Sequence, residues 1–166
     1  MEIALGLLFL ILVLALIYSF AQGATFVPSA PAKVEFMIKL LAVKSGELAA
    51  DLGSGDGRIV IALAEAGAIA HGYEINPLLV WWSRRNISQA GLQRRAFIHL
   101  KSFWGKDLAA FDVVVVYGIG YIMKKLGQKL KRELKPGARV VSFAFPLPGW
   151  QEEKKEAGVY LYIKPH

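Results

Sequence analysis

Three glycines fall within five residues of the run DLGSGDGRIV, residues 51–60, and no other feature of this sequence restricts its fold as strongly. The run joins the short apolar segment ELAADL to GRIVIALAEAG, whose apolar residues recur at helical spacing. Because glycine lacks a Cβ, such a loop can turn sharply and bring bare backbone close to a ligand. We therefore expect a strand, a glycine loop and a helix at this point of the chain.

Segments with strand and helix character alternate along the rest of the chain. The expected strands after the glycine loop are AIAHGYEI, AFIHLKS, DVVVVYG and ARVVSFAF, and the expected helices are residues 31–43, 77–91 and 121–134. Ser29 is expected to cap the first of these helices, and Asn76 and Pro77 to begin the second. This alternation predicts a doubly wound, Rossmann-like α/β sheet that is mostly parallel. The tail WQEEKKEAGVYLYIK predicts a closing antiparallel hairpin, turned at residues 156–158.

The chain opens with an apolar segment, and residues 3–20 carry no charge. A helix of this length would span about 27 Å, close to the hydrocarbon thickness of a bilayer. We therefore expect a transmembrane anchor over residues 1–22, a connector over 23–30 and one globular domain over 31–166, with a cleaved signal peptide as the alternative. Lysines soon after the apolar segment predict a single-pass membrane protein whose globular domain is on the cytoplasmic side.

The charge of the chain is mostly positive and unevenly distributed. There are 20 Lys and Arg residues against 13 Asp and Glu, and only Glu2 is charged among residues 1–32. An anionic membrane surface would attract such a domain, whereas the lack of a compact basic run disfavours a nucleic acid partner. Trp81 and Trp82 are expected to be core and membrane-interface residues. Four arginines are expected to form a solvated or lipid-facing surface, or to dock substrate: Arg84, Arg85, Arg94 and Arg95.

The residue types that bind metals in proteins do not cluster in this sequence. Cysteine is absent, so disulfides and thiolate metal sites are excluded. His71 and His99 lie in separate expected strands, without a nearby Cys or a Glu-x-x-His spacing. We therefore expect no metal site.

The residues of the glycine loop distinguish between two nucleotide cofactors. In an open α/β sheet, ligands bind beyond the carboxyl ends of the strands, where this loop is expected. A dinucleotide loop reads G-x-G-x-x-G and holds a pyrophosphate, but here the spacing is G-x-G-x-G and two carboxylates, Asp51 and Asp56, accompany it. Carboxylates suit a cation, and S-adenosylmethionine carries an ammonium, a sulfonium and one carboxylate. Glu74, at the end of the next expected strand, can accept both ribose hydroxyls.

Several motifs resemble one methyltransferase family. DLGSGDGRI followed by GYEINPLLV resembles the class I S-adenosylmethionine-dependent methyltransferases, which have a seven-stranded sheet. FVPS, NPLLV, LKPGARVVS and FPLPGW resemble one subgroup, the membrane-anchored protein lysine methyltransferases of ATP synthase c-subunit and adenine nucleotide translocase, with their prokaryotic relatives. The resemblance runs from Phe26 to the C-terminus. It implies an enzyme that methylates a lysine of a membrane-associated protein.

The resemblance also implies which residues hold the cofactor. Asp51 and four loop residues would line its methionine end: Gly53, Ser54, Gly55 and Gly57. Glu74 would hold the ribose, with Asn76 beside it. The family often has an Asp after the third strand that reads the adenine, but this chain has Ser102 there, and Phe103 or Trp104 would cover the ring.

The acceptor amine must lose its proton before methyl transfer. Neutralising a lysine with a pKa near 10.4 at pH 7 costs about 4–5 kcal/mol, and a dry site beside a sulfonium lowers that cost. Tyr117 and Ser29 are candidate catalytic residues that would align the amine. The expected substrate contacts are Pro28, Tyr117, Phe145, Pro146 and Trp150. Core packing is the alternative for Tyr117 and Trp150, and loop stiffening for Pro146.

Taken together, these patterns predict a membrane-anchored, S-adenosylmethionine-dependent enzyme that N-methylates a lysine of a membrane-associated protein. Nucleic-acid amine methyltransferases have an Asn or Asp followed by two prolines after the fourth strand, whereas this chain reads YGIGY. Two alternatives remain open. One is a methyltransferase for a lipid or quinone headgroup, and the other is a non-catalytic module that only binds the cofactor.

Overall fold

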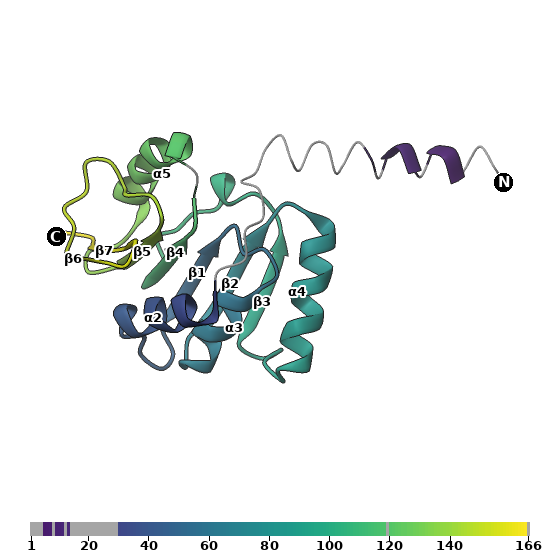
Figure 1. Ribbon diagram of the computed structural model, residues 1–166, viewed down its shortest axis with the longest axis horizontal. Coiled ribbons are helices and arrows are strands. Elements are labelled where there is room, and N and C mark those ends of the chain that lie inside the picture. Colours follow the sequence, from purple (N-terminus) through teal and green to yellow (C-terminus); the bar gives the residue numbers. More distant parts are fainter. Residues whose placement is uncertain (1–4, 8, 12, 14–29, 119, 166) are drawn as a thin grey trace.

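The structure is a computed structural model of the chain, and it describes residues 5–7, 9–11, 13, 30–118 and 120–165. A seven-stranded sheet in the order β3-β2-β1-β4-β5-β7-β6 forms the centre of the domain (Figure 1). The strands are β1 (Leu48–Leu52), β2 (Ile69–Glu74), β3 (Ala96–Leu100), β4 (Val113–Val116), β5 (Arg139–Phe143), β6 (Lys154–Glu156) and β7 (Val159–Ile163). Neighbouring strands from β3 to β5 are parallel, and β7 is antiparallel to both β5 and β6.

Helices cover both faces of the sheet and create two separate cores. The helices are α2 (Pro31–Leu41), α3 (Arg58–Glu65), α4 (Pro77–Gln89) and α5 (Gly120–Glu133), with a short 3₁₀ turn, η1, at Phe103–Gly105. Along β4, Val113 and Val115 pack in the core that contains α2, α3 and α4, whereas Val114 and Val116 pack in the core that contains α5. This division follows from the two-residue period of a strand, which sends successive side chains to opposite faces.

The strand order reverses at β1, because β1 pairs with β2 on one side and with β4 on the other. At such a switch point the connections leave the sheet in opposite directions, and a crevice forms beyond the carboxyl ends of the strands. The glycine loop joins β1 to α3 at this point (Figure 1). The predicted Rossmann-like sheet, mostly parallel with an antiparallel hairpin at its end, is therefore confirmed. The hairpin turns at Ala157 and Gly158, both with positive φ.

The start of the domain differs in detail from the prediction. The first helix of the domain, α2, ends at Leu41 rather than Val43, because Ala42 adopts a left-handed conformation with φ 46°. Its N-cap position is Ala30, which has no side chain to cap the helix. Ser29 and Pro28 lie outside the described residues, and the predicted boundaries at residues 22 and 30 stay predictions.

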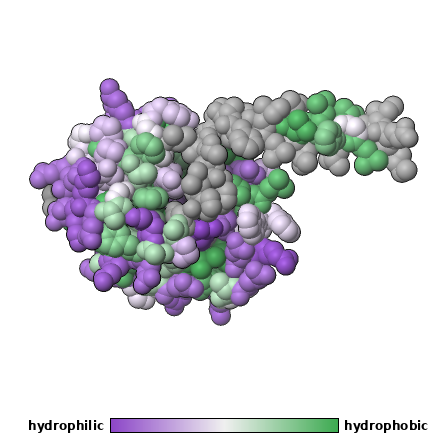
Figure 2. Space-filling model, in the orientation of Figure 1, coloured by the Kyte–Doolittle hydropathy of each residue, from purple (hydrophilic) through white to green (hydrophobic). Residues whose placement is uncertain are grey.

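The predicted single-pass membrane localisation is wrong. Within the described residues, no helix has the length and apolar character that crossing a bilayer requires. An apolar run is only a hydropathy signal, whereas a span also needs a continuous helix of about 20 residues. The described part of the predicted segment consists of residues 5–7, 9–11 and 13, and the remainder lies outside the described residues. In Figure 2 these described residues are hydrophobic, in contrast to the mixed surface of the domain.

Candidate cofactor and acceptor site

The glycine loop after β1 is held in a conformation that requires glycine. Gly53, Gly55 and Gly57 have φ values of 97°, 52° and 83°, in the left-handed region that other residues rarely adopt. The N–H groups of Gly53 and Ser54 both donate to the Tyr73 carbonyl oxygen, at 3.0 and 3.1 Å, and fasten the loop to the end of β2. A Cβ on Gly53 would meet no atom of the described residues within 4 Å, so among these residues the space in front of this backbone is open to a ligand.

Gly57 serves a different purpose from Gly53. A Cβ added there would lie 2.7 Å from the Cβ of Ser83, so only glycine lets α3 begin this close to α4. The close neighbour of this glycine is therefore a helix, α4. Asn86, also on α4, donates from Nδ2 to the Asp56 carbonyl oxygen at 2.9 Å. The loop is therefore supported by β2 on one side and by α4 on the other.

Three carboxylates surround the loop, and they are engaged to different degrees. Asp56 forms an ion pair with Arg58 at 2.6 Å. Glu74 accepts from the N–H of Gly55 at 3.0 Å through one oxygen, and from the N–H groups of Ile75 and Asn76 at 2.8 Å through the other. Since a carboxylate offers about four acceptor positions, Glu74 keeps capacity for a further donor such as a ribose hydroxyl.

Asp51 carries a buried oxygen that the described part of the protein leaves without a hydrogen-bond partner. Its side chain is buried, with 2% exposure, and its Oδ2 atom has no hydrogen-bond partner in the described structure. The Oγ of Ser54, in the same loop, is likewise buried and unpartnered. Burial, followed by the negative charges of Glu74 and Asp56, raises the pKa of Asp51 from 3.8 to about 8. Such groups normally have a partner, and a cationic ligand would supply one.

Asn76 and Ser102 begin the two segments that follow β2 and β3. The Asn76 side chain caps α4 by accepting from the N–H groups of Leu78 and Leu79 at 2.9 and 3.4 Å. Ser102 accepts from the Trp104 N–H at 3.3 Å, and the rings of Phe103 and Trp104 lie 4.9 Å apart. The predicted cofactor residues thus follow three adjacent strands at one edge of the sheet, because β1, β2 and β3 are parallel and neighbouring.

The predicted acceptor residues lie on the other half of the same edge. Tyr117 follows β4 and is half-buried, with its ring 4.7 Å from that of Phe143. The Phe145 carbonyl oxygen accepts from the Ser142 hydroxyl at 2.5 Å, and its ring lies near Gly120 at the start of α5. Pro146 is exposed in the loop that follows. Tyr117, Phe143 and Phe145 supply mainly aromatic surface here.

Trp150 has a packing role. Its Nε1 donates to the Gly127 carbonyl oxygen on α5 at 3.0 Å, and its ring contacts Tyr162 edge-on. The hydroxyl of Tyr162 in turn accepts from the Leu147 N–H at 2.9 Å. These contacts favour the packing alternative for Trp150 over a substrate contact.

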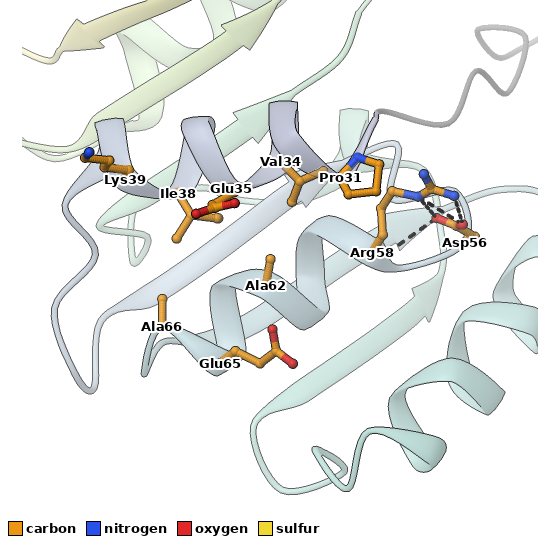
Figure 3. A pocket seen from close by; sticks show the side chains of 10 residues that line it. All are labelled: Pro31, Val34, Glu35, Ile38, Lys39, Asp56, Arg58, Ala62, Glu65 and Ala66. Atoms are coloured by element: carbon orange, nitrogen blue, oxygen red, sulfur yellow. Dashed lines mark hydrogen bonds and ion pairs between the residues drawn. The ribbon is translucent and has the colours of Figure 1, made fainter.

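A groove of about 680 Å³ runs between α2 and α3 and ends beside the glycine loop. Figure 3 shows the Arg58–Asp56 ion pair at the end near Pro31, and Lys39 and Ala66 at the other end. Arg58 was not among the predicted site residues, although its place directly after an acidic glycine loop was a usable signal. The pair fixes Asp56 at the junction of the groove and the loop.

The two predicted strand histidines form a stacked pair outside the loop region. His71 Nδ1 lies 3.0 Å from His99 Nε2, and the rings pack against Phe97 and Tyr73. Burial, assisted by nearby cations, lowers the pKa of both imidazoles. In the part of the chain that the structure describes, no three His, Asp or Glu residues lie together in a way that could hold a metal ion.

Comparison with known proteins identifies the family. The ANTKMT methyltransferase domain matches residues 51–154. The chain belongs to this family. Its family and fold are thus those of the class I, S-adenosylmethionine-dependent methyltransferases, and the resemblance seen in the sequence is confirmed.

Three relatives show how far the family likeness extends. The lysine N-methyltransferase of the ATP synthase c-subunit from Rattus norvegicus is 44% identical over 75% of this chain and 57% of its own length. A protein-lysine N-methyltransferase of Saccharolobus islandicus is 34% identical over 87% of this chain and 96% of its own. The solved RNA methyltransferase of Salinibacter ruber, in complex with S-adenosyl-L-homocysteine, is 34% identical with a TM-score of 0.80, over 84% of this chain and 95% of that one.

The ANTKMT family members of the ATP synthase type are longer than this chain. The chain spans about half the length of the first curated relatives that it matches, namely 57% for the rat protein and 50% for the mouse protein. The matched portion nevertheless contains the whole glycine loop, Glu74 and the acceptor half of the edge, because the family match runs from Asp51 to Lys154.

Proposed function

We propose that this protein transfers a methyl group from S-adenosylmethionine to the side-chain nitrogen of a lysine in a protein substrate. The observation that carries the proposal is the buried, unpartnered Oδ2 of Asp51 beside the open backbone of Gly53. A cationic cofactor would satisfy this oxygen and favour its ionised form. The relatives named as lysine N-methyltransferases, at 34% and 44% identity, support the choice of acceptor.

The cofactor would lie along the edge formed by β1, β2 and β3. Its methionine end would face Asp51, Ser54 and the loop glycines Gly53, Gly55 and Gly57. Its ribose would use the remaining acceptor capacity of Glu74, whose position is fixed by three backbone N–H groups. Asn76 holds the start of α4 beside it. Ser102 and Phe103 would meet the adenine at the end of β3.

Methyl transfer then depends on positioning and on removing a proton from the acceptor. When bound, the cofactor supplies a methyl group on a sulfonium, a leaving group that needs no further activation. The rings of Tyr117, Phe143 and Phe145 would exclude water around the acceptor amine, and burial lowers the pKa of an ammonium. The Tyr117 hydroxyl would align the neutral amine for in-line attack, since such alignment is the main demand of the reaction.

The test measures where the methyl group goes. Purified full-length protein is incubated with radiolabelled S-adenosylmethionine and membranes that contain ATP synthase c-subunit, and label is then counted in protein, lipid and RNA. We expect label on a protein lysine, lost with Glu74→Ala and unchanged with Glu152→Ala, which removes an exposed acid from the far hairpin. Label in lipid or quinone would replace the acceptor, and cofactor binding without any label would indicate a non-catalytic module.

RNA is the second acceptor to test, because one solved relative carries that name. The Salinibacter ruber protein shares 34% of its residues with this chain and is described as an RNA methyltransferase. Label in RNA that survives protease treatment, with none in protein, would favour this candidate over lysine.

A further inference from the structure

Helix α4 presents an apolar face to solvent. Its buried side is formed by Val80, Ser83 and Ile87. The opposite side exposes Leu78, Trp81 and Trp82, with exposed fractions of 52%, 65% and 46%, and the exposed Arg85 follows one turn further along. These residues have the i, i+3, i+4, i+7 spacing of one helix face. The outward face of a surface helix is normally polar, so two exposed tryptophans on it need an explanation.

This face belongs to a larger region that is positive throughout. From Ile75 to Lys106 the sequence contains no Asp or Glu, and its six cations are Arg84, Arg85, Arg94, Arg95, Lys101 and Lys106. Arg84 donates to the Ile98 carbonyl oxygen at 2.9 Å, so side chains of α4 extend to the edge strand β3. Leu100, at the end of β3, is 55% exposed. We call this combination of apolar and basic side chains on α4 and β3 the α4–β3 surface.

The α4–β3 surface lies at one side of the domain. Figure 1 places α4 at the end of the sheet beyond β3, far from the C-terminal hairpin. On this side Figure 2 shows hydrophobic and pale side chains next to strongly hydrophilic ones. The helix begins directly after Glu74 and Asn76, so its N-terminal end is at the same edge of the sheet as the candidate cofactor site.

Charge and shape decide among the occupants of this surface. A second copy of the chain would bring two positive regions together, because the surface carries cations without acids. The tryptophans protrude from a convex helix, whereas single-stranded nucleic acid is usually bound in a groove. An anionic bilayer complements both properties: it accepts tryptophan and leucine at the headgroup level without a preformed shape, and its phosphates pair with arginine.

We propose that the α4–β3 surface adsorbs peripherally to bilayers that contain anionic phospholipid. Trp81, Trp82 and Leu78 enter the headgroup region, while Arg84 and Arg85 contact lipid phosphates. The contact uses side chains of a folded helix and requires no membrane-spanning segment. It directs the edge that carries Glu74 toward the lipid surface, and it does not depend on the methyl acceptor.

The experiment compares binding of the full-length chain to two vesicle types. One is pure phosphatidylcholine and the other contains about one third phosphatidylglycerol. The measured quantity is the increase in partition coefficient from neutral to anionic vesicles, which removes any binding by the apolar N-terminal residues. We expect Arg84→Gln/Arg85→Gln to lower this increase about 30-fold, since each cation near such a surface contributes about 1 kcal/mol. Added salt should lower it as well.

The matched controls separate the α4–β3 surface from general positive charge. Lys124→Gln/Arg132→Gln removes the same charge from exposed positions of α5, on the opposite face of the sheet, and should leave the increase nearly unchanged. Trp81→Ala/Trp82→Ala should abolish the blue shift of tryptophan fluorescence on anionic vesicles while thermal unfolding stays as in the parent. The proposal is overturned if either α4 variant binds anionic vesicles as the parent does. An RNA or an acidic protein that binds the surface while anionic vesicles do not would overturn it too.

Discussion

The edge of the sheet that carries the candidate site has two halves, and different kinds of side chain form them. In the half formed by β1 and β2, polar side chains are tied to backbone: Glu74 accepts three N–H groups and Asn76 accepts two. In the half formed by β4 and β5, the main contacts are between rings, such as Tyr117 with Phe143. The first half has fixed polar geometry, and the second offers apolar walls.

This difference matches two different chemical tasks. A cofactor with fixed charges is best held by groups that cannot reorient, and a backbone-anchored carboxylate such as Glu74 meets that need. An acceptor lysine must instead lose water and a proton, which apolar walls promote. We therefore expect substitutions in the β1–β2 half to change cofactor affinity. Substitutions in the β4–β5 half should change turnover, or should leave both turnover and cofactor affinity unchanged.

The sharpest test of the β1–β2 half uses two glycines with similar backbone angles. Gly53 has φ 97° and Gly91 has φ 70°, and in the part of the chain that the structure describes, a Cβ on either would meet no atom within 4 Å. Alanine at either position should lower the free energy of unfolding by about 1–2 kcal/mol, because both adopt left-handed conformations. Only Gly53→Ala should weaken S-adenosylhomocysteine binding, by at least about 30-fold, since its Cβ would fill the space meant for the ligand.

Calorimetric titration and thermal unfolding of both variants provide the measurements. Equal affinity in Gly53→Ala and Gly91→Ala would mean that the cofactor does not approach this backbone. In that case the assignment of the β1–β2 half to cofactor binding would be wrong.

At Asp51 the cofactor site can be tested by varying the pH instead of by adding a Cβ. Its pKa is raised from 3.8 to about 8, so the folded protein holds this proton more tightly than the unfolded chain. The stability of the cofactor-free protein should therefore fall as the pH rises from about 4 to about 8. Binding of a cation should release the same proton, and affinity should rise by up to about tenfold per pH unit until the pH reaches about 8.

Asp51→Asn should remove most of this pH dependence, whereas Asp107→Asn, at an exposed position, should preserve it. Calorimetry in two buffers with different heats of ionisation counts the protons released. If the parent protein releases none between pH 6 and pH 7, either Asp51 is already ionised in the free protein or it does not face the cation.

The glycine loop and the strand-end acid were predictable from sequence because they are local properties. Three glycines in five residues can only reflect unusual backbone angles or close approach, and all three have positive φ. Glu74 was recognisable because it ends the next expected strand along the chain. The parallel order of β1 and β2 then brings the two positions to the same edge.

Partners distant in sequence were not predictable in the same way. Nothing near Gly57 indicated that it touches Ser83 on another helix, and nothing near Trp150 indicated its bond to Gly127 on α5. The unpartnered state of Asp51 is also invisible in sequence, because it depends on what the surrounding fold leaves unsatisfied. The membrane-spanning helix was inferred from apolar composition alone, and the described residues contain no helix that could form it.

In the β4–β5 half, Tyr117→Phe should have a moderate effect confined to turnover. Loss of one aligning hydrogen bond should lower kcat about fivefold, which corresponds to about 1 kcal/mol. The ring contact with Phe143 survives, so the melting temperature should not change. Tyr121→Phe is the matched control, because Tyr121 is 73% exposed. A change in cofactor affinity with unchanged kcat would place Tyr117 in the cofactor half instead.

Trp150→Phe should have the smallest effect on activity of these substitutions, and its main effect should be on the free energy of unfolding. The substitution keeps an aromatic ring against Tyr162 but removes the Nε1 donor to the Gly127 carbonyl oxygen at a partly buried position. The free energy of unfolding should fall by about 1–2 kcal/mol, while KM and kcat stay within about twofold of the parent. A several-fold rise in KM with unchanged stability would return Trp150 to the substrate contacts. The apolar walls of the β4–β5 half would then extend to the base of the hairpin, because Trp150 lies in the loop that leads to β6.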